Sequence, residues 1–120
     1  MKMIKRFTLV LSSMVLASMA LTSHAQYPES PVKMIVGFPP GQATDIVARY
    51  MAQKFADNIP GSNFIVDNRP GASGILGSRI VAGATPDGLT LMMGSSATLA
   101  VNPALYKDLP YDVFSGAKVD

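Results

Sequence analysis

The 120-residue sequence contains no cysteine and no tryptophan, and its single histidine is His24. The absence of thiols excludes disulfides, thiolate metal sites and Cys–His nucleophile pairs. His24 falls in a segment that we expect to be removed, so the mature chain would also lack imidazole, which excludes His-ligated metals and Ser–His catalysis. Carboxylates, lysine and tyrosine remain as possible catalytic groups, and a chain without disulfides depends on packing for its stability.

The first 25 residues have the composition of an export signal. Three positive charges (Lys2, Lys5 and Arg6) precede an apolar stretch at 7–21, and the small residues Ser23 and Ala25 fit a signal-peptidase site. The alternative is a membrane anchor, but the apolar stretch of about 15 residues is shorter than the roughly 20 needed to span a bilayer. We predict that residues 1–25 are a signal peptide cleaved after Ala25 and that residues 26–120 are periplasmic.

Removal of this leader changes the charge of the protein. The whole chain has 10 Lys and Arg against 8 Asp and Glu, and three of the basic residues but none of the acidic ones lie in the leader. The mature chain is left with seven basic and eight acidic residues, and its basic residues are scattered. Nucleic acids bind to clustered positive charge, so a nucleic-acid partner is not expected.

Apolar stretches of strand length alternate with helical patterns along the rest of the chain. Strands are predicted at 32–38, 63–68 and 89–93, and helices at 44–58, 73–84 and 96–101. This alternation predicts an α/β fold with right-handed crossovers and a parallel sheet flanked by helices.

Helical periodicity predicts which faces of the two longer helices are buried. In the first helix these are Ile46, Val47, Tyr50, Met51 and Phe55, with Arg49 on the opposite side. In the second they are Ile75, Leu76, Ile80 and Val81. Gly74 and Gly77 lower the helical propensity of the second helix, and two glycines in so short a helix indicate close backbone approach.

Each predicted strand ends in a turn rich in small residues, and each turn opens a helix. The turns lie at 38–45, 68–74 and 94–98. Backbone N–H groups at the start of a helix have no partner within it and face anions favourably, so each turn is a candidate site for a carboxylate. In a parallel sheet the three turns share one edge. The candidate ligand-binding residues are Phe38, Pro40, Gly41, Gln42, Ala43, Thr44, Asp45, Ala72, Ser73, Gly74, Ser95 and Ser96.

Simpler structural roles remain open for several of these residues. A single glycine-rich turn is often only a turn, and Ser95 and Ser96 are also typical helix N-caps. A carboxylate beside an anion would repel it, so we expect Asp45 to brace its turn. Arg69 has two alternatives: it binds the ligand carboxylate, or it pairs with Asp67 or Asp45.

The turns and their flanking sequences resemble a known receptor family. The motifs that carry the resemblance are Tyr27-Pro28, Phe38-Pro39-Pro40-Gly41 with Thr44 to Arg49, Asn68-Arg69-Pro70-Gly71-Ala72, Pro86-Asp87-Gly88, and Asn102-Pro103 with Leu105-Tyr106 and Leu109 to Asp112. Together they are similar to the substrate-binding proteins of tripartite tricarboxylate transporters, the Bug receptors. The resemblance implies the type II periplasmic-binding-protein fold, in which two α/β lobes hold a small organic carboxylate for membrane transporter subunits. It also implies that backbone amides and water from the loops after the first strands hold the ligand. We therefore predict that the protein is a receptor and not an enzyme, and that it binds no metal or cofactor.

Two departures from the family pattern bear on function. Gln42 stands where the family usually has glycine, which affects ligand preference. After Asp112 the sequence leaves the family pattern and ends, whereas family members continue, so a missing second lobe and a truncated product or fragment are expected. Two alternatives remain, a nucleotide- or cofactor-binding α/β domain and a non-functional remnant. The first lacks support because Gly71, Gly74 and Gly77 have the wrong spacing for a dinucleotide fingerprint.

Overall fold

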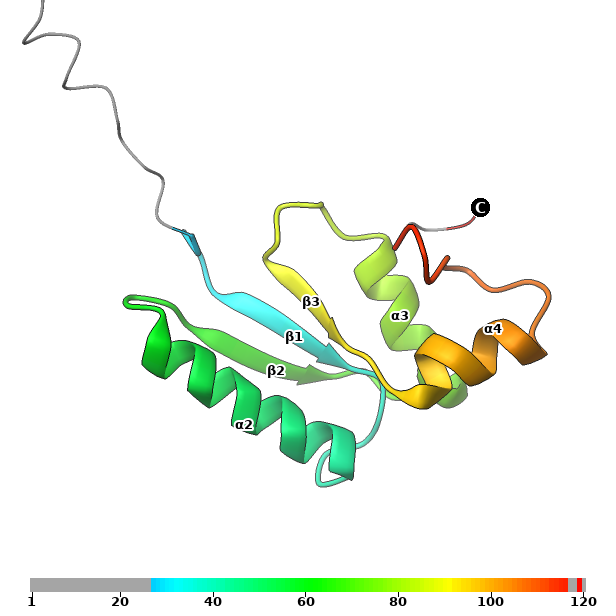
Figure 1. Ribbon diagram of the computed structural model, residues 1–120, viewed down its shortest axis with the longest axis horizontal. Coiled ribbons are helices and arrows are strands. Elements are labelled where there is room, and N and C mark those ends of the chain that lie inside the picture. The colour runs from blue at the N-terminus through cyan, green and yellow to red at the C-terminus, as the bar shows by residue number, and fades with distance from the viewer. Residues whose placement is uncertain (1–26, 117–118, 120) are drawn as a thin grey trace, which may run out of the picture.

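The computed structural model describes residues 27–116 and Val119, so the predicted signal peptide lies outside the described residues (Figure 1). The strands are β1 (Val32–Val36), β2 (Phe64–Asn68) and β3 (Thr90–Met93). The helices are α2 (Ala43–Asn58), the 3₁₀ turn η2 (Ala72–Gly74), α3 (Ile75–Ala82), the π-helical turn η3 (Ala97–Val101) and α4 (Asn102–Leu105). No helix in this part of the chain has the length and apolarity needed to cross a membrane.

The three strands form one parallel sheet in the order β2-β1-β3, which confirms the predicted α/β alternation. The register pairs Val32 with Phe64 on one side, and Lys33 with Thr90 on the other. The connection from β1 to β2 and the connection from β2 to β3 cross the sheet in opposite directions. Because crossovers between parallel strands are right-handed, α2 and α3 lie on opposite faces of the sheet. Figure 1 shows α2 along one side of the sheet and α3 with α4 on the other.

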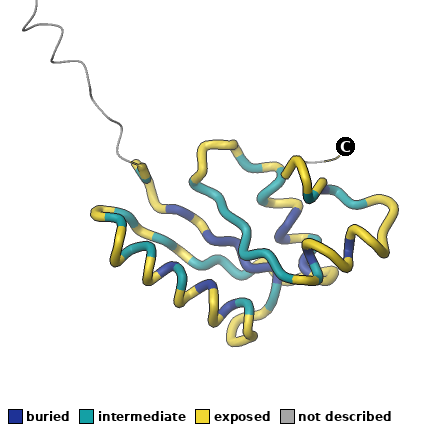
Figure 2. Tube along the Cα trace, in the orientation of Figure 1, coloured by how far each residue is buried: buried dark blue, intermediate teal, exposed yellow. Residues whose placement is uncertain are grey.

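The core is centred on β1, the middle strand. Four of its five residues, Val32, Met34, Ile35 and Val36, are buried, and only Lys33 is exposed (Figure 2). A strand covered on both faces is the reason for the nearly continuous apolar sequence at this position. The two flanking strands are at most half-buried along most of their length.

The predicted buried face of α2 is wrong for three of its five residues. Ile46, Val47 and Tyr50 are exposed, and the helix buries Asp45, Ala48 and Ala52 instead. Met51 and Phe55 are half-buried, and the Phe55 ring lies 5.2 Å from that of Phe64 in β2. The two alanines let the helix backbone come close to the sheet, and Asp45 needs the polar partners that lie beneath it, so these requirements set the rotation of the helix.

The predicted face of α3 is also partly wrong, whereas the glycine prediction is confirmed. Leu76 and Ile80 are exposed, Gly77 and Ser78 are buried, and the α-helix ends at Ala82. A Cβ on Gly77 would lie 3.1 Å from the Cα of Gly37, so the start of α3 touches the end of β1 backbone to backbone. A methyl group there would be crowded and would require a shift of the Gly37 backbone.

The last helical segment is longer than predicted. Asn102-Pro103 was expected to follow the end of the helix at Val101, but η3 runs directly into α4, which continues to Leu105. Pro103 is the second residue of α4, a position near the start of a helix where the fixed φ of proline is tolerated. Asn102 is the first residue of α4 and lies where η3 and α4 join.

Candidate functional site

The three turns predicted to share one edge of the sheet do so. They are loop 1 (residues 37–42), loop 2 (residues 69–74) and loop 3 (residues 94–96), and their strands end in register, with Val36 paired to Asn68 and Met93. Gly74 is the meeting point of loop 1, loop 2 and η3, the helical turn that follows loop 3, because a Cβ there would lie 3.4 Å from the Phe38 ring and 2.6 Å from Thr98 Cγ2. The fold thus brings loop 1, loop 2 and the start of the helical segment after loop 3 into contact.

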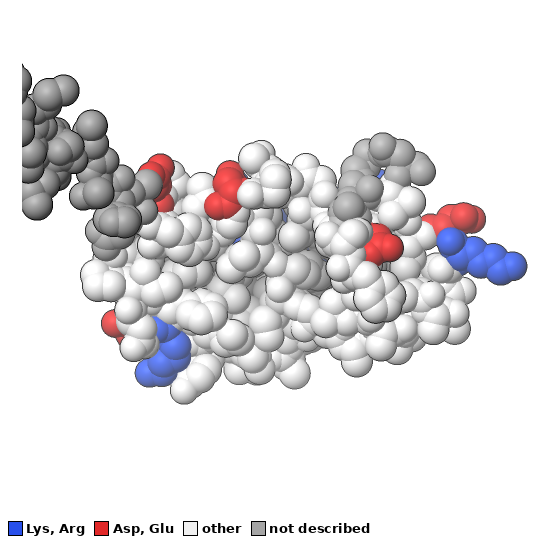
Figure 3. Space-filling model, turned by 45° about the horizontal axis from the view of Figure 1, so that its top comes forward, with Lys and Arg blue, Asp and Glu red and all other residues white. Residues whose placement is uncertain are grey.

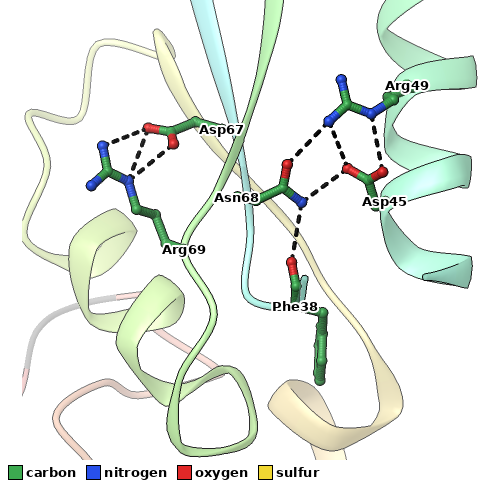
Figure 4. Close-up of polar contacts among 6 residues, drawn as sticks. All are labelled: Phe38, Asp45, Arg49, Asp67, Asn68 and Arg69. Atoms are coloured by element: carbon green, nitrogen blue, oxygen red, sulfur yellow. Dashed lines mark hydrogen bonds and ion pairs between the residues drawn. The ribbon is translucent and has the colours of Figure 1, made fainter. Parts of the chain in front are cut away.

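Loop 1 is braced by a buried carboxylate. Asp45, 2% exposed, accepts hydrogen bonds from Gly41 N–H at 2.9 Å, from Arg49 Nε at 3.0 Å and from Asn68 Nδ2 at 2.9 Å (Figure 4). Arg49 Nη2 also lies 3.0 Å from Asp45 Oδ1. The Arg49 hydrogen bond first, then those from Gly41 and Asn68, lower the pKa of Asp45 from its ordinary 3.8 to about 2. Asp45 is therefore ionised, paired and fully engaged within the protein, as the bracing prediction expected.

Asn68 ties loop 1 to the strand that leads into loop 2. Its Nδ2 donates to the Phe38 carbonyl at 3.1 Å as well as to Asp45, and its Oδ1 accepts from Arg49 Nη2 at 3.1 Å. The sequence analysis missed both Asn68 and the role of Arg49. The i, i+4 spacing of Asp45 and Arg49 was the available signal for the ion pair, but nothing local indicates the long-range contact with Asn68.

Some of the backbone N–H groups proposed for anion binding already have partners within the protein. Gly41 N–H donates to Asp45, Gly74 N–H to Gly71 O at 3.0 Å, and Ser95 N–H to Thr98 Oγ1 at 3.0 Å. Within residues 41–43, 72–74 and 95–96, the other N–H groups have no acceptor in the described part of the chain; they are those of Gln42, Ala43, Ala72, Ser73 and Ser96. The set of candidate donors is thus corrected to these five residues.

The candidate residues differ in their exposure to solvent. The exposed candidates are Pro40, Gly41, Gln42, Ala43, Ala72, Ser73 and Ser96. The half-buried ones are Phe38, Thr44 and Ser95, and the buried ones are Asp45 and Gly74. The five residues with free N–H groups are all exposed, so each lies where a ligand can reach it.

Loop 2 has an unusual backbone held by a buried amide. Ala72 and Ser73 have φ of 47° and 53°, a left-handed conformation that costs a non-glycine residue roughly 1 kcal/mol or more. Asn102, 1% exposed, donates from Nδ2 to Ser73 O at 3.0 Å. Residues held in this conformation need surrounding structure that compensates for its strain, and Asn102 provides part of it. The sequence analysis did not predict this contact.

Loop 3 is fixed by Thr98 and Tyr111. The Thr98 hydroxyl exchanges hydrogen bonds with the Ser95 backbone, and Thr98 N–H donates to Ser95 Oγ at 3.3 Å, which is the N-cap interaction expected as one alternative for Ser95. Ser96 makes no side-chain cap. The Tyr111 hydroxyl donates to Thr98 O at 2.8 Å, so a hydrogen bond from the segment after α4 holds the residue that fixes loop 3.

Arg69 follows the second of its two alternatives. Its guanidinium makes three contacts with the Asp67 carboxylate, at 3.0, 3.1 and 3.0 Å, on the other side of β2 from Asn68 (Figure 4). The surface face in Figure 3 carries only scattered charged side chains, without a basic patch. Anion recognition at the loop edge would therefore depend on backbone amides rather than on clustered side-chain charge.

A parallel α/β lobe whose free amides gather at the carboxyl ends of its strands is the architecture of a solute-binding lobe. Residues 47–118 match the family model of the tripartite tricarboxylate transporter family receptor, and the chain belongs to this family. This confirms the resemblance carried by the turn motifs.

Proteins of Bordetella pertussis are among the similar sequences. BugT is 44% identical over 88 residues, which cover 72% of this chain and 27% of BugT. A UPF0065 protein of the same organism is 38% identical over 112 residues, which cover 91% of this chain and 34% of that protein. The chain thus spans about a third or less of the length of these relatives.

Solved structures show the same fold. The periplasmic binding protein BugD is 35% identical with a TM-score of 0.65, over 73% of this chain and 29% of BugD. The structure described as R. palustris Rpa4515 with adipate is 33% identical with a TM-score of 0.69, over 73% of this chain and 29% of that one. The described residues therefore have the fold of one lobe of a periplasmic binding protein, as predicted.

Proposed function

We propose that this chain is the first lobe of an exported receptor that binds a small carboxylate and presents it to the membrane subunits of a tripartite tricarboxylate-type transporter. The observation that carries the proposal is a set of five N–H groups without an acceptor, which belong to exposed residues in or directly after the three loops at one edge of the sheet: Gln42, Ala43, Ala72, Ser73 and Ser96. In this proposal the lobe works in the periplasm after cleavage behind Ala25.

The electrostatics of the edge favour an anion although no free cation lies on it. Asp45 is the only carboxylate within loop 1 or the first turn of α2, and its charge is offset by Arg49 at 3.0 Å. The positive end of the α2 dipole and the free amides then act on the ligand, and charge-assisted hydrogen bonds of this kind are about twice as strong as neutral ones. A dicarboxylate or related acid fits this arrangement, and the relative bound to adipate supports the choice.

The described loops contact a ligand from one side only. A carboxylate taken out of water recovers its hydration through hydrogen bonds from all sides, at ~1 to 3 kcal/mol for each charge-assisted bond. Binding to this lobe by itself is therefore expected to be weak, near or beyond a millimolar Kd. We expect that thermal-shift assays with citrate, malate, succinate, glutamate or nicotinate will detect no binding to residues 26–120 at concentrations that suffice for a complete relative.

Weak binding can be measured by following backbone amide signals during a titration with adipate. Adipamide, which has the same carbon chain without charge, is the matched control ligand. We expect adipate to move the amide signals of Gln42, Ala43, Ala72, Ser73 and Ser96 in a saturable manner, while adipamide does not. Equal shifts with both ligands, or adipate shifts confined to residues outside the three loops, would contradict carboxylate binding at this edge.

A further inference from the structure

Two asparagine side chains hold two loop carbonyls in the same way. Asn68 Nδ2 donates to Phe38 O of loop 1 at 3.1 Å, and Asn102 Nδ2 donates to Ser73 O of loop 2 at 3.0 Å. Each asparagine belongs to a later part of the chain than the loop it holds. Asn68 ends β2, which leads into loop 2, and Asn102 begins α4, which follows loop 3 and η3. Loop 1 is thus attached to the strand before loop 2, and loop 2 is attached to the helical segment after loop 3.

Asn102 holds loop 2, which contains two non-glycine residues with left-handed backbone. Through Ser73 O it fixes one end of the peptide between Ser73 and Gly74, while the N–H of that peptide donates to Gly71 O at 3.0 Å. The peptide is thus fixed on both sides, directly after the two residues with left-handed backbone. The free N–H groups of Ala72 and Ser73 belong to the two peptides that precede it, so their direction depends on this attachment.

We propose that Asn102 is a positioning residue that sets the direction of the free Ala72 and Ser73 N–H groups, while Asn68 does the same for loop 1. Asn102 is 99% buried and acts on the exposed edge through its hydrogen bond to the Ser73 carbonyl. The consequence for carboxylate binding rests on the proposed function. The consequence for the loop conformation does not.

The chemistry of the position requires a neutral donor. Asn102 Nδ2 also lies 3.5 Å from the Tyr111 hydroxyl, and that hydroxyl donates its proton to Thr98 O. A carboxylate in place of the amide would face the Ser73 carbonyl without a proton to donate. A protonated carboxyl group would restore one donor in nearly the same place.

This difference gives a pH-dependent test with Asn102→Asp. Burial and a hydrogen bond made only by the protonated form both raise the pKa of a carboxyl group. Lowering the pH from about 7 to about 5 should therefore return the Ala72 and Ser73 amide signals of Asn102→Asp toward their wild-type positions, because the new carboxyl group becomes a donor. Asn102→Leu has a similar volume and no donor, so its loop 2 signals should stay displaced at every pH.

Loop 1 supplies the internal control. The Gln42 and Ala43 signals should be unaffected by the Asn102 variants and should move in Asn68→Leu, which leaves loop 2 unchanged. Displacement of both loops in both variants would mean general destabilisation and would overturn the proposal. So would an Asn102→Asp variant whose loop 2 signals do not respond to acid. Wild-type protein gives an independent check that needs no variant, because the Asn102 side-chain amide protons should exchange slowly with solvent, and fast exchange would contradict the contact.

Adipate then separates this inference from the proposed function. If the wild type binds adipate, Asn102→Leu should bind it about five- to tenfold more weakly, the effect of one hydrogen bond, and unchanged affinity would show that the direction of these amides does not matter. If the wild type does not bind adipate, the proposed ligand class fails. The pH response of loop 2 still decides whether Asn102 positions it.

Discussion

Gly41 and Gly74 differ in the space around them although their backbone conformations agree. Their φ values are 83° and 86°, in the left-handed region that glycine tolerates best. A Cβ on Gly41 would meet nothing within 4 Å, whereas on Gly74 it would lie 2.6 Å from Cγ2 of Thr98, which is 1% exposed and cannot move aside. A substitution at Gly41 therefore tests backbone strain alone, and a substitution at Gly74 tests backbone strain together with a steric clash.

We predict that Gly41→Ala lowers the free energy of unfolding by roughly 1 to 2 kcal/mol through backbone strain alone. Gly74→Ala should lower it by that amount and by about 1 to 3 kcal/mol more, because the added methyl group overpacks the meeting point of the loops. Denaturant unfolding of the two variants measures both values. Equal losses would show that the loops separate at little cost and that their contact at Gly74 is not tight.

The brace at Asp45 makes stability depend on pH in a defined window. The pKa of Asp45 is about 2 in the folded protein against an ordinary 3.8, so its contribution is complete above pH 3.8 and is lost as the pH falls through about 2. We predict that the unfolding midpoint of Asp45→Asn falls less steeply than that of the wild type between about pH 5 and about pH 2. Midpoints measured across this range test the prediction.

The other titrating groups affect the unfolding midpoints of the wild type and of Asp45→Asn in the same way. Asp112, whose pKa is lowered chiefly by the Ser115 N–H, titrates in the variant as well as in the wild type. The difference between the two curves therefore belongs to Asp45. Parallel curves would contradict a brace that depends on its charge.

Sequence reasoning at the scale of single residues succeeded where the cause was local. The helix-start position of Asp45 predicted its bracing role, and the glycines of α3 predicted close approach. It failed for Asn68 and Asn102, because their partners lie at Phe38 and Ser73, far away in the sequence. An asparagine that ends a strand or begins a helix is typical of turns, so neither residue differed from an ordinary turn former before the fold was known.

At the scale of elements, α2 shows why an apolar stripe does not always mark a buried face. Ile46 is 60% exposed and Ala48 is fully buried, the reverse of what helical periodicity predicted for Ile46. Burial here follows from the contact with β1 and β2, which admits small side chains, and from the partners required by Asp45. Neither the close helix–sheet contact nor the partners of Asp45 can be predicted from hydrophobicity alone.

A matched pair of substitutions in α2 tests this orientation. We predict that Ile46→Gln changes the free energy of unfolding by about 0.5 kcal/mol or less, as surface substitutions usually do. Ala48→Gln should lower it by about 2 kcal/mol or more, because the longer side chain overpacks the helix–sheet contact and buries an amide. Thermal or denaturant unfolding gives both numbers. A larger loss at Ile46 than at Ala48 would restore the orientation predicted from periodicity.

At the scale of the whole molecule, the order and type of the elements were predictable because the alternation of strands and helices is strong and the turns are rich in proline and glycine. Each strand was predicted one or two residues too long at one of its two ends, and the 3₁₀ and π-helical turns were not foreseen. These irregular turns depend on contacts between loops, such as the one at Gly74, which only the assembled sheet creates.

Export is the prediction that concerns the whole chain. We expect a periplasmic extract to contain the protein with Gln26 as its first residue, because a charged segment, a short apolar stretch and small residues occur in the required order. Intact mass spectrometry of that extract measures the cleavage position. Recovery of the chain with Met1 in a membrane-embedded form would contradict cleavage and favour the anchor.

The central position of β1 has a consequence for how the protein folds. Synthesis begins at the N-terminus, yet Val32 pairs with Phe64 and Lys33 with Thr90, so the first strand made has no neighbour until much of the chain has followed. Contacts of such long sequence separation slow folding. During that interval the Val-Lys-Met-Ile-Val segment of β1 is an unpaired strand with apolar side chains on both faces, and a chaperone that binds apolar segments would recognise it until β2 and β3 have been made.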